Sequence, residues 1–154
     1  MGGKRETAPA GDPLALLRYE HRTLDSLFSQ FKLRKEHQVA RRVCSHLAMH
    51  SKVEEEFYRE AETIPELHGR IDTSLREHRS LEELTRAIRG LDDGDALNEQ
   101  MLALQQAVEQ HVREEERSVF PAVLKAVSKH RMRELGANLR ATKEKLTPTG
   151  ERHK

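Results

Sequence analysis

The pentapeptide His50-Ser51-Lys52-Val53-Glu54 recurs 61 residues later as His111-Val112-Arg113-Glu114-Glu115. In each copy a histidine and a glutamate are four residues apart, so on an α-helix both lie on one face, about 6 Å from each other. A lone histidine precedes each copy, His21 before the first and His78 before the second. The chain therefore carries the same arrangement of histidine and glutamate twice.

The segments around the lone histidines also match each other. Residues 20–27 read Glu-His-Arg-Thr-Leu-Asp-Ser-Leu, and residues 77–84 read Glu-His-Arg-Ser-Leu-Glu-Glu-Leu. The repeat therefore extends over two helical hairpins of the same design, which are expected to face each other across a pseudo-twofold axis.

Apolar residues recur every three or four positions around both repeats, which is the helical period, and no alternating strand pattern exceeds a few residues. Asp12-Pro13 is typical of a helix start, with an N-cap followed by proline. The predicted helices are 13–31, 36–62, 71–89, 95–128 and 129–146, and Pro121 is expected to kink or split the end of the fourth. Four long helices joined by short loops predict an antiparallel up-down-up-down four-helix bundle, with a short extra C-terminal helix.

The predicted domain organisation has three parts. Residues 1–12 form a flexible N-terminus, residues 13–128 form the bundle, and residues 129–154 form the C-terminal helix and a basic tail. The 154 residues suit one domain.

Composition excludes several classes of protein. No apolar run approaches the ~20 residues of a membrane-spanning helix, and a net charge of +1 gives no reason to expect nucleic acid. The single cysteine excludes a disulfide framework and a Cys-rich zinc module. A cytoplasmic location is therefore expected, with neither membrane nor nucleic acid as partner.

Six polar residues occupy positions where the helical stripe requires an apolar side chain. They are His21, His50, Glu54, His78, His111 and Glu115. A buried carboxylate without a partner costs several kcal/mol or becomes protonated. Because a four-helix bundle brings all six to one level of its core, a metal centre is the common explanation for them.

The type and number of these residues narrow the choice of metal. Imidazole binds Fe, Zn, Cu and Ni, whereas carboxylate suits harder ions and can bridge two of them. The six residues are too many for one tetrahedral zinc, and they fit two six-coordinate ions. Of about 12 coordination positions, four imidazoles, two bridging carboxylates and one oxo or hydroxo bridge fill about ten. The open positions suit O2, peroxide or NO.

Two competing motifs are absent from the chain. No histidine follows a glutamate at the Glu-x-x-His spacing of ferritin-like di-iron bundles, and His-Glu-x-x-His does not occur.

The order His21, His50-x-x-x-Glu54, His78, His111-x-x-x-Glu115 resembles the hemerythrin-like (HHE cation-binding) family. The likeness covers about residues 13–128 and includes Glu115-Glu116 followed by Val119-Phe120-Pro121. It implies an antiparallel four-helix bundle with a non-haem, carboxylate-bridged pair of iron ions (Fe2+/Fe3+). By position, the resemblance makes the four histidines and two glutamates the iron ligands.

The chain departs from the oxygen-carrying members of that family on the third helix. They have a His-x-x-x-His pair there, whereas this chain has Ser74 and Glu82 on either side of His78. Tyr58, one turn beyond Glu54, is the candidate replacement ligand. A phenolate on ferric iron favours the oxidised state, which points away from O2 carriage and toward peroxide chemistry.

Other residues near the motifs are weaker candidates for metal ligands. Glu82 is more typical of a solvated helix face. His46 lies one turn before His50, but each step of four residues drifts about 40° around a helix, so His46 and Tyr58 do not easily face one site. The glutamates beside the motifs, including Glu55 and Glu116, are expected on solvated faces or as partners of the ligands.

The sequence therefore predicts binding or turnover of hydrogen peroxide, O2 or NO at a di-iron centre, and catalase-like decomposition of peroxide is the sharpest form. The alternative is a non-enzymatic iron, O2 or NO sensor or binding module. A metal-free or zinc-loaded helical scaffold is a third reading. No separate catalytic acid or base can be named from the sequence.

Overall fold

The computed structural model describes residues 12–147, and within that range it contains helices and no strand. The elements are α1 (Pro13–Arg34), α2 (His37–Ala61), a 3-10 turn (Pro65–Leu67), α3 (His68–Arg89), α4 (Asp95–Glu114), a π-helical turn (Glu115–Val119), α5 (Phe120–Ala126) and α6 (Lys129–Leu146). The all-α prediction is confirmed. The predicted flexible residues 1–11 and the end of the basic tail, residues 148–154, lie outside the described residues.

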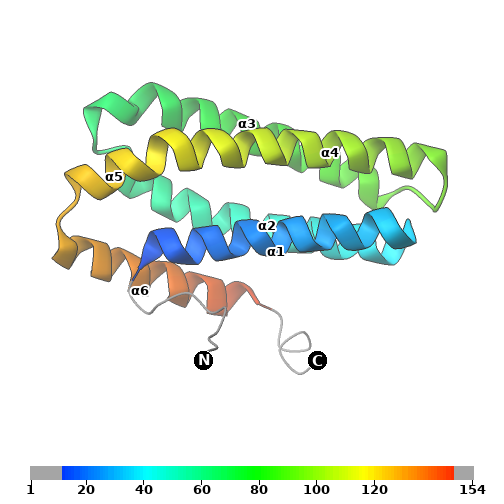
Figure 1. Cartoon of the computed structure of the whole chain (residues 1–154), viewed down its shortest axis with the longest axis horizontal. Helices are drawn as coiled ribbons and strands as arrows, with labels where there is room; N and C mark the ends of the chain where they lie inside the picture. Colours follow the sequence, from blue (N-terminus) through cyan, green and yellow to red (C-terminus); the bar gives the residue numbers. More distant parts are fainter. Residues whose placement is uncertain (1–11, 148–154) are drawn as a thin grey trace.

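Helices α1 to α4 lie side by side along the long axis of the molecule, and each packs against the next one in the chain (Figure 1). Helix α6 lies along α1 and α2, on their outer side. The turn between α1 and α2 is short because Lys35 adopts a left-handed conformation with a φ of 52°. Its N–H bonds to the carbonyl of Phe31, which ends α1 and reverses the chain.

Helix α1 begins as the sequence predicts. The side chain of Asp12 accepts hydrogen bonds from the N–H groups of Leu14 (3.0 Å) and Ala15 (3.1 Å), and Pro13 takes the first helical position. A cap of this kind contributes about 1 kcal/mol. It fixes the start of the helix that carries His21.

The predicted fourth helix is interrupted before Pro121. Helix α4 ends at Glu114, a π-helical turn follows, and α5 ends at Ala126 rather than Ser128. The N–H of Phe120 bonds to the carbonyl of Glu115, one residue farther back than in an α-helix. Pro121 has no N–H and its ring clashes with the carbonyl four residues earlier, so the preceding turn widens. The widened turn begins at Glu115, one of the predicted ligands.

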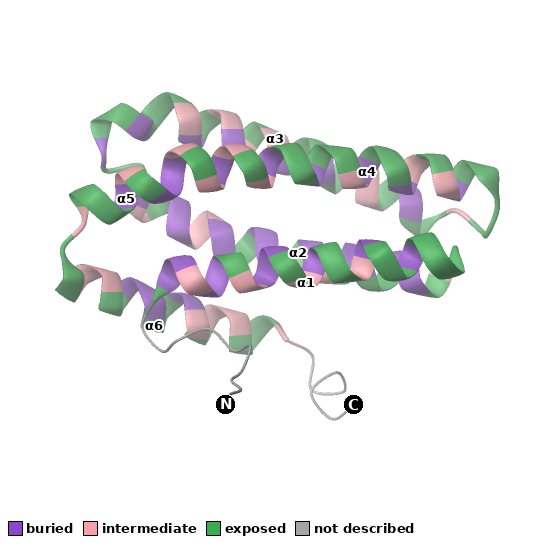
Figure 2. Cartoon of the chain, in the orientation of Figure 1, coloured by how far each residue is buried: buried purple, intermediate pink, exposed green. Residues whose placement is uncertain are grey.

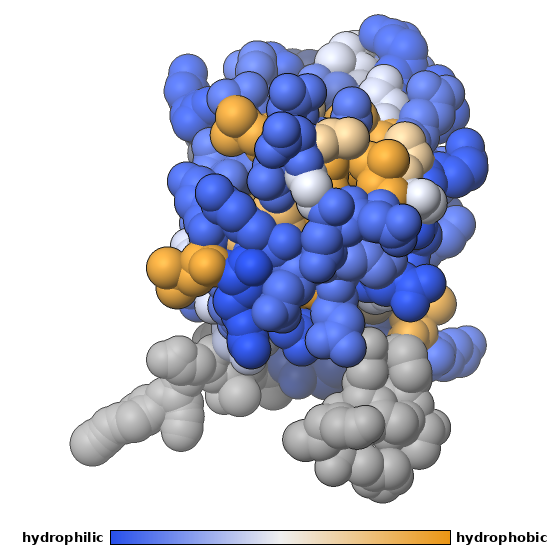
Figure 3. Space-filling view, turned by 90° about the vertical axis from the view of Figure 1, so that its right-hand side faces the viewer, coloured by the Kyte–Doolittle hydropathy of each residue, from blue (hydrophilic) through white to orange (hydrophobic). Residues whose placement is uncertain are grey.

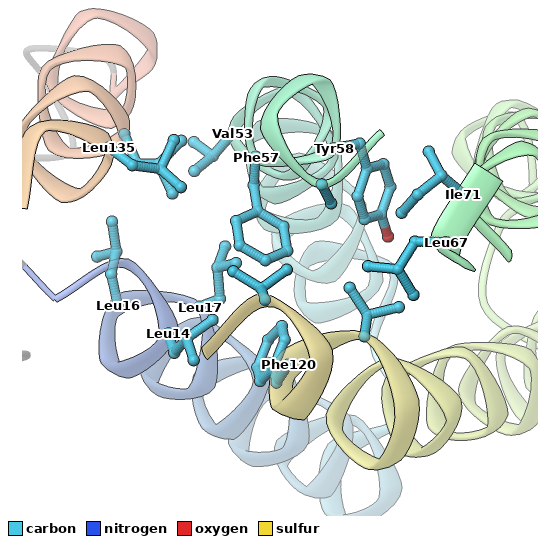
Figure 4. Packing of buried hydrophobic residues seen from close by; sticks show 14 of the residues in the cluster. Leu14, Leu16, Leu17, Val53, Phe57, Tyr58, Leu67, Ile71, Phe120 and Leu135 are labelled. Carbon is cyan, nitrogen blue, oxygen red and sulfur yellow. The ribbon is translucent and has the colours of Figure 1, made fainter. Parts of the chain in front are cut away.

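Two apolar clusters fill the interior, and the buried faces of the helices point toward it (Figure 2). The first lies near α5 and α6, where the rings of Phe57 and Phe120 meet edge to face at 5.7 Å (Figure 4). The second includes Phe28 and Leu104. On each of the four long helices the predicted histidine lies between the two clusters in sequence. The fold therefore places a polar layer between two apolar ones.

The end of the molecule that Figure 3 faces is covered mostly by hydrophilic side chains, with small groups of hydrophobic ones between them. None of the described helices combines the length and apolar character that crossing a membrane requires.

Candidate metal centre

The six predicted ligands come together in the polar layer. His21 lies on α1, His50 and Glu54 on α2, His78 on α3, His111 on α4, and Glu115 at the start of the π-helical turn. Each is buried, and none is more than 6% exposed. The helical period of the sequence thus places all six at the level of the core where the prediction put them.

Glu54 lies at the middle of this group. Its Oε2 is 3.2 Å from Nε2 of His21 and 3.0 Å from Nε2 of His50. Its Oε1 is 2.9 Å from Nε2 of His78 and 3.2 Å from Nε2 of His111. Each oxygen therefore faces one pair of histidines from neighbouring helices. This is the arrangement that a carboxylate needs to bridge two metal ions.

Two candidate metal positions result. One is surrounded by His21, His50 and Glu54, and the other by Glu54, His78 and His111. Within each group the ligand atoms all lie within 4.8 Å of one another. An ion with bonds of about 2.0–2.3 Å to nitrogen and oxygen fits between atoms at such separations. The two positions share Glu54.

Glu115 adds a second carboxyl group beside the first. Its Oε1 lies 3.2 Å from Nε2 of His21 but has no well-aligned hydrogen bond. Burial and the negative charge of Glu54 raise the pKa of Glu115 to about 7. Burial also works against the charged form of Glu54, but the charge of His50 and several hydrogen bonds hold the pKa of Glu54 well below its usual range. Without a cation, the buried site does not readily hold both carboxylates ionised.

The four histidines are oriented by four further glutamates. Each Nδ1 faces one carboxylate: His21 with Glu116 (2.7 Å), His50 with Glu20 (2.6 Å), His78 with Glu55 (3.3 Å) and His111 with Glu77 (2.7 Å). An ionised carboxylate only accepts, so each Nδ1 carries the hydrogen. When it gives up its second proton, each imidazole directs the lone pair of its Nε2 toward the centre, as metal-binding histidines do.

The inward lone pairs need a positive charge between them. Nε2 of His78 and Nε2 of His111 are only 3.2 Å apart. Two lone pairs at that distance repel, so the site takes up protons or metal ions. The donor set of imidazoles and carboxylates, oriented from behind, therefore fits a pair of metal ions.

The orienting glutamates follow the repeat. Glu20 and Glu77 each precede a lone histidine, and Glu55 and Glu116 each follow a candidate ligand glutamate. The sequence pattern is compatible with either a solvated face or a ligand partner for Glu55 and Glu116, and it predicts no role for Glu20 or Glu77. Their matching places in the two halves are the signal that identifies all four.

Tyr58 faces the centre on the side of His78 and His111. Its hydroxyl is 3.1 Å from Nε2 of His111 and 3.0 Å from Oε1 of Glu54, and it donates to Oε2 of Glu115 at 2.5 Å. It also interacts with the side chain of Ser74 on α3. Tyr58 thus lies within hydrogen-bond distance of one candidate histidine and both candidate glutamates.

The two weaker candidates lie apart from the ligand atoms. Glu82 is exposed on α3. His46 is half-buried and belongs to neither candidate metal position. Burial and the charge of His50 lower the pKa of His46 to about 4, so it is neutral near pH 7.

A cleft of about 380 Å³ lies between α1 and α4, beside His21. His21 and Glu116 form part of its wall, together with the side chains of Arg22 and Arg113. On the interior side, the ring of Phe120 lies nearly parallel to His21, with centroids 6.1 Å apart. The cleft can admit a small molecule to the His21 side, while apolar packing closes the other.

Of three comparisons with known proteins, one found a match, which is to a family model. No curated protein and no solved structure matches the chain. Residues 12–123 match the family model described as the hemerythrin HHE cation binding domain. That range contains the five residues of the two candidate metal positions and Glu115 beside them, as well as the four glutamates behind the histidines. The chain therefore belongs to the hemerythrin HHE cation-binding domain family.

Proposed function

We propose that this chain is a non-haem di-iron protein that binds or turns over hydrogen peroxide, O2 or NO, with catalase-like decomposition of peroxide as the sharpest form. The observation that carries this proposal is the position of Glu54, whose two oxygens each face one pair of inward-directed histidines. The proposed frame is an up-down-up-down four-helix bundle over residues 13–128, to which residues 129–154 are added.

The ligand roles in this proposal follow the two candidate positions. One iron would be held by His21 and His50, and the other by His78 and His111 with Tyr58. Glu54 and Glu115 would be the carboxylate ligands available to both. Iron is supported over a single zinc by the number and type of donors, because carboxylate bridges and six-coordination suit an iron pair.

The surrounding residues prepare this site for a small ligand. When bound, the iron pair supplies the electron exchange by which two molecules of hydrogen peroxide give one O2 and two waters. Phe57 and Phe120 keep bulk water from the interior side, and the cleft beside His21 admits the ligand. The Tyr58 hydroxyl donates a hydrogen bond to Oε2 of Glu115 at 2.5 Å and so holds a proton beside the two candidate positions.

Metal analysis and a peroxide assay test this function. Purified protein should contain about two irons per chain, as the two candidate positions require. Adding hydrogen peroxide should release O2 faster than the same concentration of free iron does. A clear excess of zinc, or no metal after careful purification, would contradict the iron pair. Bound iron without O2 release would support the sensor or binding-module alternative.

Replacing Tyr58 by phenylalanine tests whether Tyr58 is an iron ligand in addition to the four histidines and two glutamates. In the absence of metal, burial and the charges of Glu115 and Glu54 raise the pKa of Tyr58 well above its usual range. Bound ferric ions would outweigh the negative charges of Glu115 and Glu54 and would stabilise the phenolate form of Tyr58. Tyr58→Phe should therefore remove the visible phenolate-to-iron absorption band while two irons remain bound. Tyr19→Phe, which changes a half-buried tyrosine on α1, should keep the band. An unchanged spectrum for Tyr58→Phe would exclude Tyr58 as a ligand.

We infer that the protein works in a reducing cytoplasm with a small molecule as its partner, and that neither nucleic acid nor a membrane takes part. Cys44, the single cysteine of the chain, is buried in the second apolar cluster, so the fold does not depend on a disulfide and is compatible with this location.

A further inference from the structure

One side chain of α6, outside the part of the chain that matches the family model, contacts a glutamate that lies behind the candidate metal centre. Helix α6 (Lys129–Leu146) packs on α1 and α2, and it buries Leu135 and Leu139 against the first apolar cluster. One turn after Leu139, Nζ of Lys143 lies 3.2 Å from Oε2 of Glu20. The same ammonium group lies 5.2 Å from the centre of the Tyr19 ring.

The contact partner of Lys143 is the glutamate that orients His50. The Glu20 side chain is fully buried, and its other oxygen, Oε1, is 2.6 Å from Nδ1 of His50. A continuous line of contacts therefore runs from Lys143 through Glu20 and His50 to Glu54. Oε2 of Glu20 has no well-aligned hydrogen bond in the described part of the chain, so the nearby ammonium group offsets its buried charge.

Among residues 12–147, the other half of the repeat has no counterpart of this arrangement. Glu77 holds Nδ1 of His111 at 2.7 Å, as Glu20 holds His50. The Glu77 side chain is 39% exposed, so water offsets its charge, and Arg70 acts on it only from a greater distance. Since α6 packs on α1 and α2, it covers only one side of an otherwise repeated site. The two candidate metal positions are therefore electrostatically unequal.

We propose that Lys143 is a positioning residue for the metal centre, which acts through Glu20 on His50 and makes the ion at His21 and His50 the more electron-poor of the pair. This inference rests on the proposed di-metal function. A carboxylate behind Nδ1 strengthens electron donation from Nε2 to a metal. An ammonium group on the far oxygen of that carboxylate draws the negative charge away and weakens this donation. Its own positive charge acts in the same direction.

The Lys143→Met variant tests the proposal with Co2+ as the probe. Methionine keeps the length of the side chain and removes the charge. When metal-free protein is titrated with cobalt chloride, one of the two ions should bind about tenfold more tightly to the variant than to the wild type. The reason is that the positive charge of Lys143, which repels the metal ion, has been removed. The other ion should keep its Kd within about twofold. Lys143→Arg keeps the charge and should match the wild type. Lys145→Met, on the exposed side of α6, is the matched control and should also match it.

A double mutant separates action through Glu20 from a general effect on the fold. When Glu20→Gln is already present, Lys143 has no carboxylate to hold it near the centre, so Lys143→Met should change the Co2+ Kd by less than about twofold. If Lys143 has a purely structural role, the Lys143→Met variant should bind Co2+ more weakly than the wild type or equally well. Either result would overturn the proposal. Equal effects of Lys143→Met in the presence and in the absence of Glu20 would also overturn it. Failure of the wild type to bind Co2+ would overturn the metal centre itself, and the inference with it.

Discussion

The Glu54→Gln variant is expected to lose both irons and to be markedly less stable than the wild type. Each oxygen of Glu54 faces one histidine pair, so the substitution removes the ligand that the two positions share. A glutamine also places an amide nitrogen, which does not ligate a metal ion, where one of the two carboxylate oxygens was. Metal affinity should fall by at least about hundredfold, which exceeds the loss of an orienting partner behind a ligand. Metal analysis and titration with Fe2+ under anaerobic conditions measure this fall.

The same variant should destabilise the metal-free protein. Glu54 is fully buried, and its charge stabilises the protonated forms of the surrounding histidines. Removing one partner from a buried ionic network costs about 3–5 kcal/mol. Denaturant unfolding with and without metal measures both losses, because metal that binds only the folded state raises its stability.

The matched control is Glu83→Gln. It makes the same chemical change at an exposed position of α3 and should keep two irons and wild-type stability. Retention of both irons by Glu54→Gln with unchanged affinity would contradict the shared bridge.

Metal loading is expected to reverse the pH dependence of stability. In the metal-free protein, burial alone would lower the pKa of His50, but Glu54 and Glu20 raise it to about 9. For His111, burial is likewise outweighed by Glu54 and Glu77, and the pKa rises to about 10. A histidine whose pKa is raised by folding adds stability below its unfolded value near 6.5, and this stability is lost as the pH rises through the folded value. The metal-free protein should therefore lose a few kcal/mol between about pH 7 and pH 10.

The metal-loaded protein should behave in the opposite way. Metal binds the deprotonated Nε2, so it must displace the protons of the histidines, and its affinity should rise with pH. At pH 7 loading should release at least about two protons per chain, because the pKa values of His50 and His111 lie above 7 and the pKa of His21 is also raised. Release can be followed with a pH indicator in weakly buffered protein as Fe2+ or Co2+ is added. Stoichiometric metal binding without proton release, or a metal-free protein that gains stability from pH 7 to pH 10, would contradict this prediction.

The six central residues could be predicted because a local rule places them. Helical periodicity assigns His21, His50, His78 and His111 to buried faces, and the i, i+4 spacing adds Glu54 and Glu115. No tertiary information is needed for this step, since a polar residue in an apolar stripe points into the core of any helical bundle. The family match over residues 12–123 agrees with it.

The histidine partners of the orienting glutamates could not be predicted from helical periodicity. Glu20 and Glu77 lie next to histidines in the sequence, yet each bonds to a histidine on the following helix rather than to its neighbour. Which glutamate meets which Nδ1 depends on the rotation and axial register of two packed helices. The repeat indicates that the four are equivalent in pairs, but it does not name their partners.

By itself, the sequence determined the all-helical class, the helices that carry the candidate ligands and the level of the core at which they meet. These follow from a 3.6-residue period, which is a property of each segment alone. Tertiary structure decided the π-helical turn at Glu115, the place of Tyr58 against Ser74 and the contact of Lys143 with Glu20. Each of these depends on how one helix is positioned against another. A repeated sequence therefore produced two matching halves, and the packing of α6 on one side made them different.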